Sequence, residues 1–115
     1  MICEQEKCLN CNDHFFQLRP KIKKVLTSNH FKKDAPDFDT SLILDCQHEH
    51  FTKLHKLEET IDGNHIFRAI KGKTHYVYAI DKKNRLIFLR AFKNFQDYKK
   101  FLNEKKIILK IIQNA

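Results

Sequence analysis

Three runs of β-forming residues, separated by short turns, constrain the second half of this chain more than any other feature. The runs cover residues 65–70, 75–80 and Arg85–Phe92, and each is rich in isoleucine, phenylalanine, tyrosine or valine. Two four-residue turns, at 71–74 and 81–84, separate them. Connections this short can join only antiparallel neighbours, so the sequence predicts a three-stranded meander.

Segments with helical spacing are predicted before the meander. Pro20 is expected to open a first helix that ends near Phe31, because proline is tolerated at the first helical position. A second helix is expected to begin at Asp39 or Thr40, either of which can cap it, and to end at about Phe51.

The end of the chain is predicted to form one final helix. Asn94 can cap it, and apolar side chains recur at helical spacing opposite a lysine-rich face: Phe95, Tyr98, Leu102, Leu109 and Ile112. Because the three strands are apolar on both sides, helices must cover at least one face of the sheet.

Two further segments are predicted to be extended. Residues 14–19 could form a short N-terminal strand, and residues 53–57 an extended lead-in that a turn at 61–64 joins to the meander. The predicted fold class is therefore α+β. It is a small antiparallel sheet, the meander plus the candidate N-terminal strand, packed by two N-terminal helices and one C-terminal helix. With 115 residues the chain has room for one domain, 1–115, with a polar, cysteine-rich extension at about residues 1–13.

The charge of the chain points to a polyanionic partner. Lysine and arginine number 22 against 14 aspartate and glutamate residues, which gives a formal net charge of +8. No apolar run is longer than the five residues 76–80, which is too short for a transmembrane span or a signal peptide, so we expect a cytoplasmic protein with no membrane partner. Two glycines in all exclude glycine-rich phosphate loops.

Cysteine and histidine crowd the start of the chain. The spacing C-x4-C-x2-C-x2-H, over Cys3, Cys8, Cys11 and His14, is compatible with a tetrahedral zinc site. With Cys46 as a fourth ligand it also fits an iron–sulfur spacing, although that cluster normally sits in a glycine-rich loop that this segment lacks. The simplest interpretation is a polar segment with reduced thiols, and no metal or other cofactor is expected.

The order of elements and several short motifs resemble the RelE/YoeB/YafQ/ParE superfamily of bacterial and archaeal toxins. The likeness lies in His-Lys-Leu at 55–57, Ile-Phe-Arg-Ala-Ile at 66–70, and a final strand that carries Arg90. Residues 72–84, Gly-Lys-Thr-His-Tyr-Val-Tyr-Ala-Ile-Asp-Lys-Lys-Asn, are similar to the family pattern G-x-x-R-(L/V)-(V/I)-Y-x-(V/I)-D. His75 stands where many members have arginine.

This resemblance implies an endoribonuclease that cleaves mRNA, in some members on the ribosome, and that an acidic antitoxin protein holds inactive. The reaction is metal-free attack by a 2′-OH on the adjacent phosphate, which needs a base, an acid and fixed positive charge. The candidate catalytic residues that the resemblance implies are His55, Arg68, Arg90, His75 and Tyr98. The lysines expected to follow the RNA backbone are Lys53, Lys56, Lys71 and Lys73.

Several of these side chains also have a purely structural interpretation. Arg68 could pair with a buried acid, His75 could be an edge or packing residue, and Tyr98 fits the core stripe of the last helix. Tyr76 and Tyr78 share a strand face, where they could stack on RNA bases or pack under a helix.

Three other functions are compatible with the same sequence. The first is a noncatalytic module that binds RNA, DNA or a protein, for which arginine at position 75 would be dispensable. The second is a gyrase poison, a branch of the superfamily that needs no ribonuclease residues. The third is a small metal-dependent module built on the N-terminal cysteines.

Overall fold

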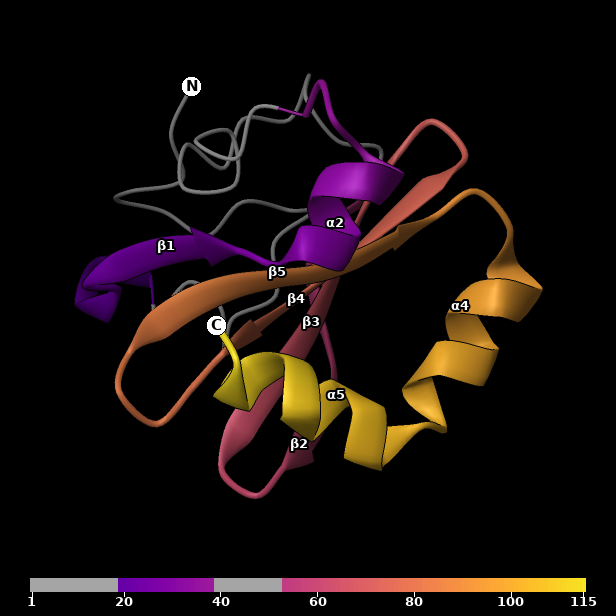
Figure 1. The fold of residues 1–115 in the computed structure, drawn as a ribbon. Coiled ribbons are helices and arrows are strands. Elements are labelled where there is room, and N and C mark those ends of the chain that lie inside the picture. Colours follow the sequence, from indigo (N-terminus) through magenta and orange to yellow (C-terminus); the bar gives the residue numbers. More distant parts are fainter. Residues whose placement is uncertain (1–18, 39–52) are drawn as a thin grey trace.

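A computed structural model describes residues 19–38 and 53–115, which form a five-stranded sheet with helices packed against it (Figure 1). The sheet order is β1-β5-β4-β3-β2. The strands are β1 (Lys24–Thr27), β2 (Lys53–Ile61), β3 (Asn64–Lys71), β4 (Thr74–Ile80) and β5 (Arg85–Phe92). The described helices are a 3-10 turn at Arg19–Lys21, α2 (Asn29–Asp34), α4 (Phe95–Leu102) and α5 (Lys105–Gln113).

The meander is confirmed and has four strands. The pairs β2–β3, β3–β4 and β4–β5 are all antiparallel, and the expected lead-in at 53–57 is the first part of the nine-residue strand β2. The turn between β2 and β3 uses Asp62 and Gly63 at φ values of 50° and 80°. This left-handed backbone suits glycine and matches the right-handed twist of the flanking strands.

The predicted helix at residues 20–31 is wrong over most of its length. Pro20 belongs to a single 3-10 turn, and Lys24–Thr27 form β1, which pairs in parallel with β5. The side chains of β1 alternate, because Val25 packs against the core on one face of the sheet and Leu26 against the core on the other. The sheet is therefore mixed, where an antiparallel sheet was expected.

Only the last part of that predicted helix is helical, as the short helix α2. The hydroxyl oxygen of Ser28 accepts the backbone N–H of Phe31, 3.0 Å away, and donates to the carbonyl of Leu89 at 2.8 Å. This residue therefore caps α2 and ties it to β5. The candidate strand at 14–19 lies outside the described residues except for Arg19, which belongs to the 3-10 turn, and the second predicted helix, from 39 or 40 to 51, lies outside them entirely.

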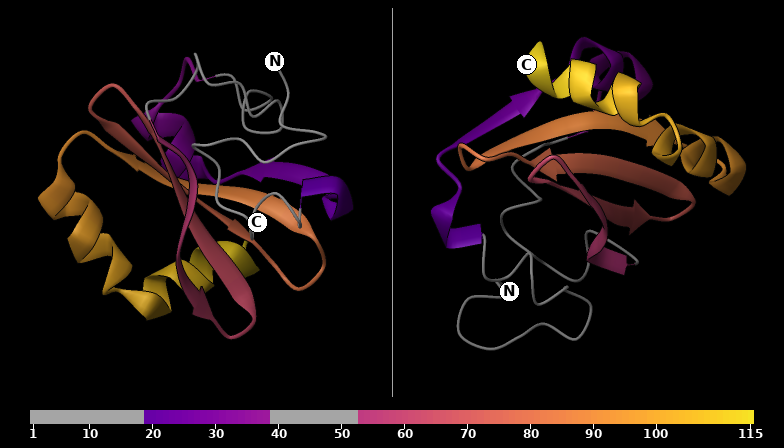
Figure 2. Two further views of the ribbon diagram at one scale, coloured as in Figure 1. Left: turned by 180° about the vertical axis from the view of Figure 1, so that it is seen from behind. Right: turned by 90° about the horizontal axis from the view of Figure 1, so that it is seen from below.

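The final helix is two helices, with a break at Asn103 and Glu104. The predicted cap is confirmed, since the Asn94 side chain accepts the backbone N–H of Asp97 at 2.8 Å. Helices α4 and α5 lie along one face of the sheet (Figure 2). The break allows both helices to bury apolar side chains against the same sheet: Tyr98, Phe101, Ile108 and Ile112.

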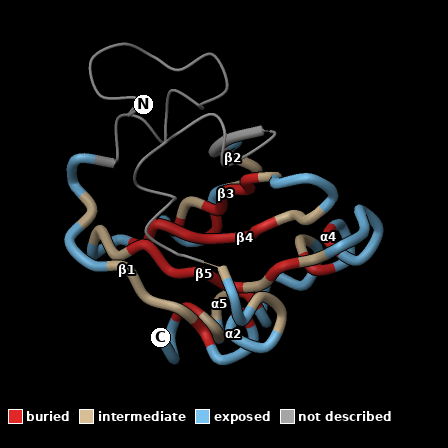
Figure 3. Tube along the Cα trace, turned by 90° about the horizontal axis from the view of Figure 1, so that it is seen from above, coloured by how far each residue is buried: buried red, intermediate tan, exposed pale blue. Residues whose placement is uncertain are grey.

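Each face of the sheet carries its own apolar core, and burial is greatest in β3, β4 and β5 (Figure 3). The α4–α5 face contains Ile66, Val77 and Leu89. The opposite face contains Tyr76 and Tyr78, which are 8% and 0% exposed, so this pair packs in the core and is not a surface for stacking bases. None of the helices in residues 19–38 and 53–115 is long and apolar enough to span a membrane.

Candidate functional site

Four polar or aromatic side chains meet on the α4–α5 face of the sheet, each from a different element. Glu58 comes from β2, Arg68 from β3, His75 from β4 and Tyr98 from α4. We call them the polar cluster. The strand period of two places Arg68 on the same face as Ile66, and therefore under the helices. Three of the candidate catalytic residues, Arg68, His75 and Tyr98, thus lie together.

Glu58 is the centre of this cluster. Its Oε2 accepts a short hydrogen bond from the hydroxyl of Tyr98, and its Oε1 lies 3.7 Å from Nη2 of Arg68. The guanidinium carbon of Arg68 is also 4.8 Å from the centroid of the Tyr98 ring, a cation–π contact. The side chains of Arg68 and Glu58 are only 10% and 14% exposed, so each charge depends on the other for compensation.

Tyr98 is a hydrogen-bond donor that holds its proton. Burial raises the pKa of its hydroxyl far above the usual 10.0, and the hydrogen bond to Glu58 and the charge of that carboxylate raise the pKa further. The phenol therefore stays neutral at physiological pH. It positions the carboxylate and cannot act as a base.

His75 is the titratable group of the cluster that a ligand can reach. Its ring is parallel to that of Tyr98, with centroids 5.2 Å apart and an interplanar angle of 8°. Burial lowers its pKa below 6.5, the Arg68 guanidinium lowers the pKa further, and the Glu58 carboxylate offsets part of the shift. Its Nδ1 is buried and makes no hydrogen bond, while the residue as a whole is half-buried. At neutral pH the imidazole is uncharged and can accept a proton.

Phe95 lies beside this cluster and is exposed. It was expected in the core stripe of the final helix, yet half of the residue is accessible to solvent. Its ring centroid is 5.9 Å from that of His75 and 5.8 Å from that of Tyr98. The Nζ atom of Lys99 lies 5.4 Å from the centroid of the Phe95 ring. The cluster therefore has an aromatic surface and a lysine at its solvent side.

Glu58 is not among the site residues that the sequence predicts, although one signal points toward it. Arg68 lies on a strand face between apolar residues, which requires either a buried acid or an open site. The structure supplies the acid from β2, the neighbouring strand, one residue beyond the segment expected to be extended.

Arg90 lies apart from the polar cluster and contacts α2. Its Nε and Nη2 donate to Oδ2 and Oδ1 of Asp34, at 2.6 and 3.3 Å, and the backbone N–H of Ala91 donates to the same carboxylate at 3.1 Å. A register shift in β5 opposite Val77 and Tyr78 interrupts the alternation of side chains between the two faces of the sheet at this point. The charge of Arg90 is therefore used to join β5 to α2.

The remaining candidates are distributed along the edges of the sheet. His55 and Lys53 belong to β2, and their side chains lie outside what the structure describes. The ammonium group of Lys56 is 3.8 Å from Glu58 Oε1, and this side chain is 64% exposed. Lys71 and Lys73 are exposed at the turn between β3 and β4.

The residues of the possible zinc and iron–sulfur sites, Cys3, Cys8, Cys11, His14 and Cys46, all lie outside the described residues. Within 19–38 and 53–115, no three histidine, cysteine or acidic side chains are grouped so that they could hold a metal ion.

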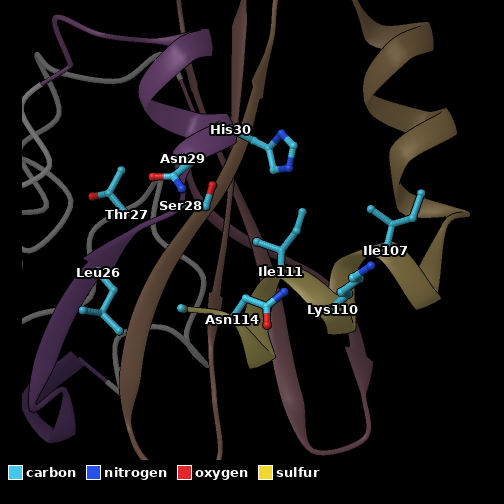
Figure 4. Close-up of a pocket in the computed structure, with 10 residues that line it drawn as sticks. Leu26, Thr27, Ser28, Asn29, His30, Ile107, Lys110, Ile111 and Asn114 are labelled. Atoms are coloured by element: carbon cyan, nitrogen blue, oxygen red, sulfur yellow. The ribbon is translucent and has the colours of Figure 1, made fainter.

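A hollow of about 500 Å³ lies between the start of α2 and helix α5 (Figure 4). Leu26, Ile107 and Ile111 form its apolar part, and His30 and Lys110 are the ionisable side chains that line it. No aspartate or glutamate side chain is among the described residues that line this hollow, so it is less suited to acid–base catalysis than the polar cluster.

A scan against family models, a search of curated proteins and a search of solved structures give no match to this chain. The assignment of a function therefore depends on the chemistry of the site.

Proposed function

We propose that the chain is an endoribonuclease of toxin-like type, which cleaves mRNA without a metal by attack of a 2′-OH on the adjacent phosphate. The observation that carries this proposal is the position of His75. A half-buried imidazole that is neutral at physiological pH lies beside a buried arginine and next to an exposed aromatic ring.

The roles follow from the chemistry that this cleavage requires. His75 Nε2 takes the proton of the 2′-OH, the 2′-oxygen bonds to phosphorus, and the bond from phosphorus to the 5′-oxygen breaks. Arg68 supplies positive potential to the phosphorane. The leaving oxygen takes its proton from solvent. Glu58 and Tyr98 are positioning residues, because their contacts fix Arg68 and the stacked face of His75.

The positive surface supports a polyanionic substrate. The net charge is +8, and Lys56 at the cluster and Lys71 and Lys73 at the next turn are exposed. Such lysines neutralise phosphates without reading sequence. The same charge suits an acidic protein partner that inhibits the nuclease, and we include such an antitoxin in the proposal.

The second candidate function is noncatalytic binding of RNA by the same surface. One observation favours it: Arg68 is only 9% exposed and is paired with Glu58, so its charge is partly compensated before any phosphate arrives. Under this alternative His75 is a packing residue against Tyr98.

The deciding experiment is RNA cleavage in a translation extract by wild type and His75→Gln. His30→Gln is the matched control, since His30 is an exposed histidine that lines the hollow between α2 and α5. Loss of the general base should lower the rate about 10²- to 10⁴-fold. Because the pKa of His75 lies below 6.5, the acid side of the pH–rate profile should have its midpoint below 6.5. A folded wild type that does not cleave, or a His75→Gln protein as active as His30→Gln, would exclude the nuclease.

A further inference from the structure

The side chain of Phe95 is exposed to solvent beside the polar cluster. Among the described residues, Phe95 and Ile107 are the two large apolar side chains that solvent reaches most, at 50% and 45%. Phe95 is the first residue of α4, where Tyr98 and Phe101 of the same helix are buried. A single exposed aromatic side chain is common at a protein surface, so the groups around the Phe95 ring decide what it can meet.

The surroundings of the Phe95 ring favour a flat ligand with a nearby negative charge. Lys99 lies over the ring, and His75 and Tyr98 lie beside it. The carboxylate in the same helical turn, Asp97, accepts from the Asn94 side chain at 2.7 Å. Bases of single-stranded RNA stack on such rings while lysines hold their phosphates.

We propose that Phe95 is the stacking platform for one base of single-stranded RNA, which it holds beside His75 with Lys99 close to the phosphate. This inference rests on the proposed function and adds a binding subsite to it. It also replaces Tyr76 and Tyr78 as the stacking surface, because both tyrosines are buried on the other face of the sheet.

The subsite can be observed directly, because the chain contains no tryptophan. A Phe95→Trp variant carries a single indole at the proposed platform, and an Ile107→Trp variant carries one at the other exposed position. A short RNA with 2′-O-methyl groups binds but cannot be cleaved by 2′-OH attack. Saturation with this RNA should quench the emission of Phe95→Trp and leave that of Ile107→Trp unchanged.

The contribution to affinity is measured with the same uncleavable RNA. Phe95→Ala should weaken binding roughly 5- to 150-fold, as expected for one stacked base, whereas Ile107→Ala should stay within about twofold of wild type. A series of RNAs with one abasic residue at successive positions locates the stacked base. When the abasic residue is at that position, wild type should bind the abasic RNA as weakly as Phe95→Ala binds the intact RNA. Phe95→Ala should bind that abasic RNA no more weakly than it binds the intact RNA, because the two changes remove the same contact.

The outcomes separate the subsite from the nuclease. Quenching and weaker binding without any cleavage would support the Phe95 subsite and overturn the proposed nuclease. Cleavage that depends on His75, with equal RNA affinity for wild type and Phe95→Ala, would overturn the subsite alone. Equal quenching of both tryptophan variants, or equal affinity for intact and all abasic RNAs, would also overturn it.

Discussion

The imidazole of His75 lies parallel to the phenol ring of Tyr98, with 5.2 Å between ring centroids. This stack connects strand β4 to helix α4. The hydroxyl of the same tyrosine donates to Glu58 on β2, so one side chain holds both the histidine and the carboxylate. A substitution of either His75 or Tyr98 therefore tests the contacts of the whole cluster.

Acidification is expected to cost stability through His75. The unfolded chain takes up a proton near the ordinary pKa of 6.5, whereas the folded protein does so only at lower pH. As the pH falls from 6.5 through the folded pKa, the unfolded state is favoured. Urea unfolding at about pH 7.5 and about pH 5.5 should therefore show that the free energy of unfolding falls more for wild type than for His75→Gln between these two pH values. Equal losses in the two proteins would contradict the shift.

Removal of the Tyr98 hydroxyl should destabilise the fold while the ring stays in place. In Tyr98→Phe, Glu58 Oε2 loses its donor, and Oε1 already lacks a hydrogen bond. We expect a loss of about 1–3 kcal/mol in the free energy of unfolding. The measurement is urea unfolding of the four proteins of a double-mutant cycle with Glu58→Ala. The cost of Tyr98→Phe should largely disappear in the Glu58→Ala background, and an undiminished cost there would refute the pairing.

Local pattern was enough to predict the meander, because its information lies within short windows. The runs that became β3, β4 and β5 are short and rich in β-forming residues, and the turns beside them carry Gly63, Gly72 and Asn84 at positive φ. By contrast, β1 could not be recognised. Ile22, Val25 and Leu26 recur at helical spacing, while Val25 and Leu26 also suit a strand that packs on both faces, and the free edge of β5 decides between the two.

The site was predictable in part for the same reason. Arg68 and His75 became candidates because they lie within short motifs that resemble the toxin superfamily, which is a local signal. Their arrangement depends on Glu58, which reaches Tyr98 across 40 positions of the chain. The partner of Arg90 is Asp34, across 56 positions. Spacing rules contain no information on contacts of this range, so the shared cluster and the separate Arg90 pair emerge only in three dimensions.

Arg90 should matter for stability and not for cleavage. Arg90→Met removes the donor pair of Asp34 and leaves that carboxylate with the Ala91 N–H alone. Since the side chains of Arg90 and Asp34 are both partly exposed, we expect Arg90→Met to lower the free energy of unfolding, measured with urea, by about 1–2 kcal/mol. RNA cleavage per folded molecule should equal that of wild type. A cleavage defect without a loss of stability would instead return Arg90 to the catalytic residues.

Asp81 should stabilise the turn between β4 and β5 in a pH-dependent way. Its Oδ1 accepts the backbone N–H groups of Lys83 and Arg85, each at 2.9 Å, and its Oδ2 accepts Nε of Arg85 at 2.7 Å. Burial alone would raise the pKa of Asp81, but these hydrogen bonds and the charge of Arg85 outweigh it and lower the pKa below 3.8. The carboxylate therefore contributes stability above pH 3.8, and this contribution is lost as the pH falls through the lower, folded pKa.

The test compares Asp81→Asn with Asp62→Asn, which changes an exposed aspartate in the β2–β3 turn. At neutral pH, Asp81→Asn should lower the free energy of unfolding by about 1–3 kcal/mol, because asparagine cannot reproduce both sets of contacts. Asp62→Asn should stay within about 0.5 kcal/mol of wild type, as usual for surface positions. At about pH 3 the difference between Asp81→Asn and wild type should shrink, since below 3.8 the carboxylate of the unfolded wild type takes up a proton that the folded state binds less readily. A difference that stays constant from neutral pH to acid would show that the turn depends on the shape of Asp81 and not on its charge.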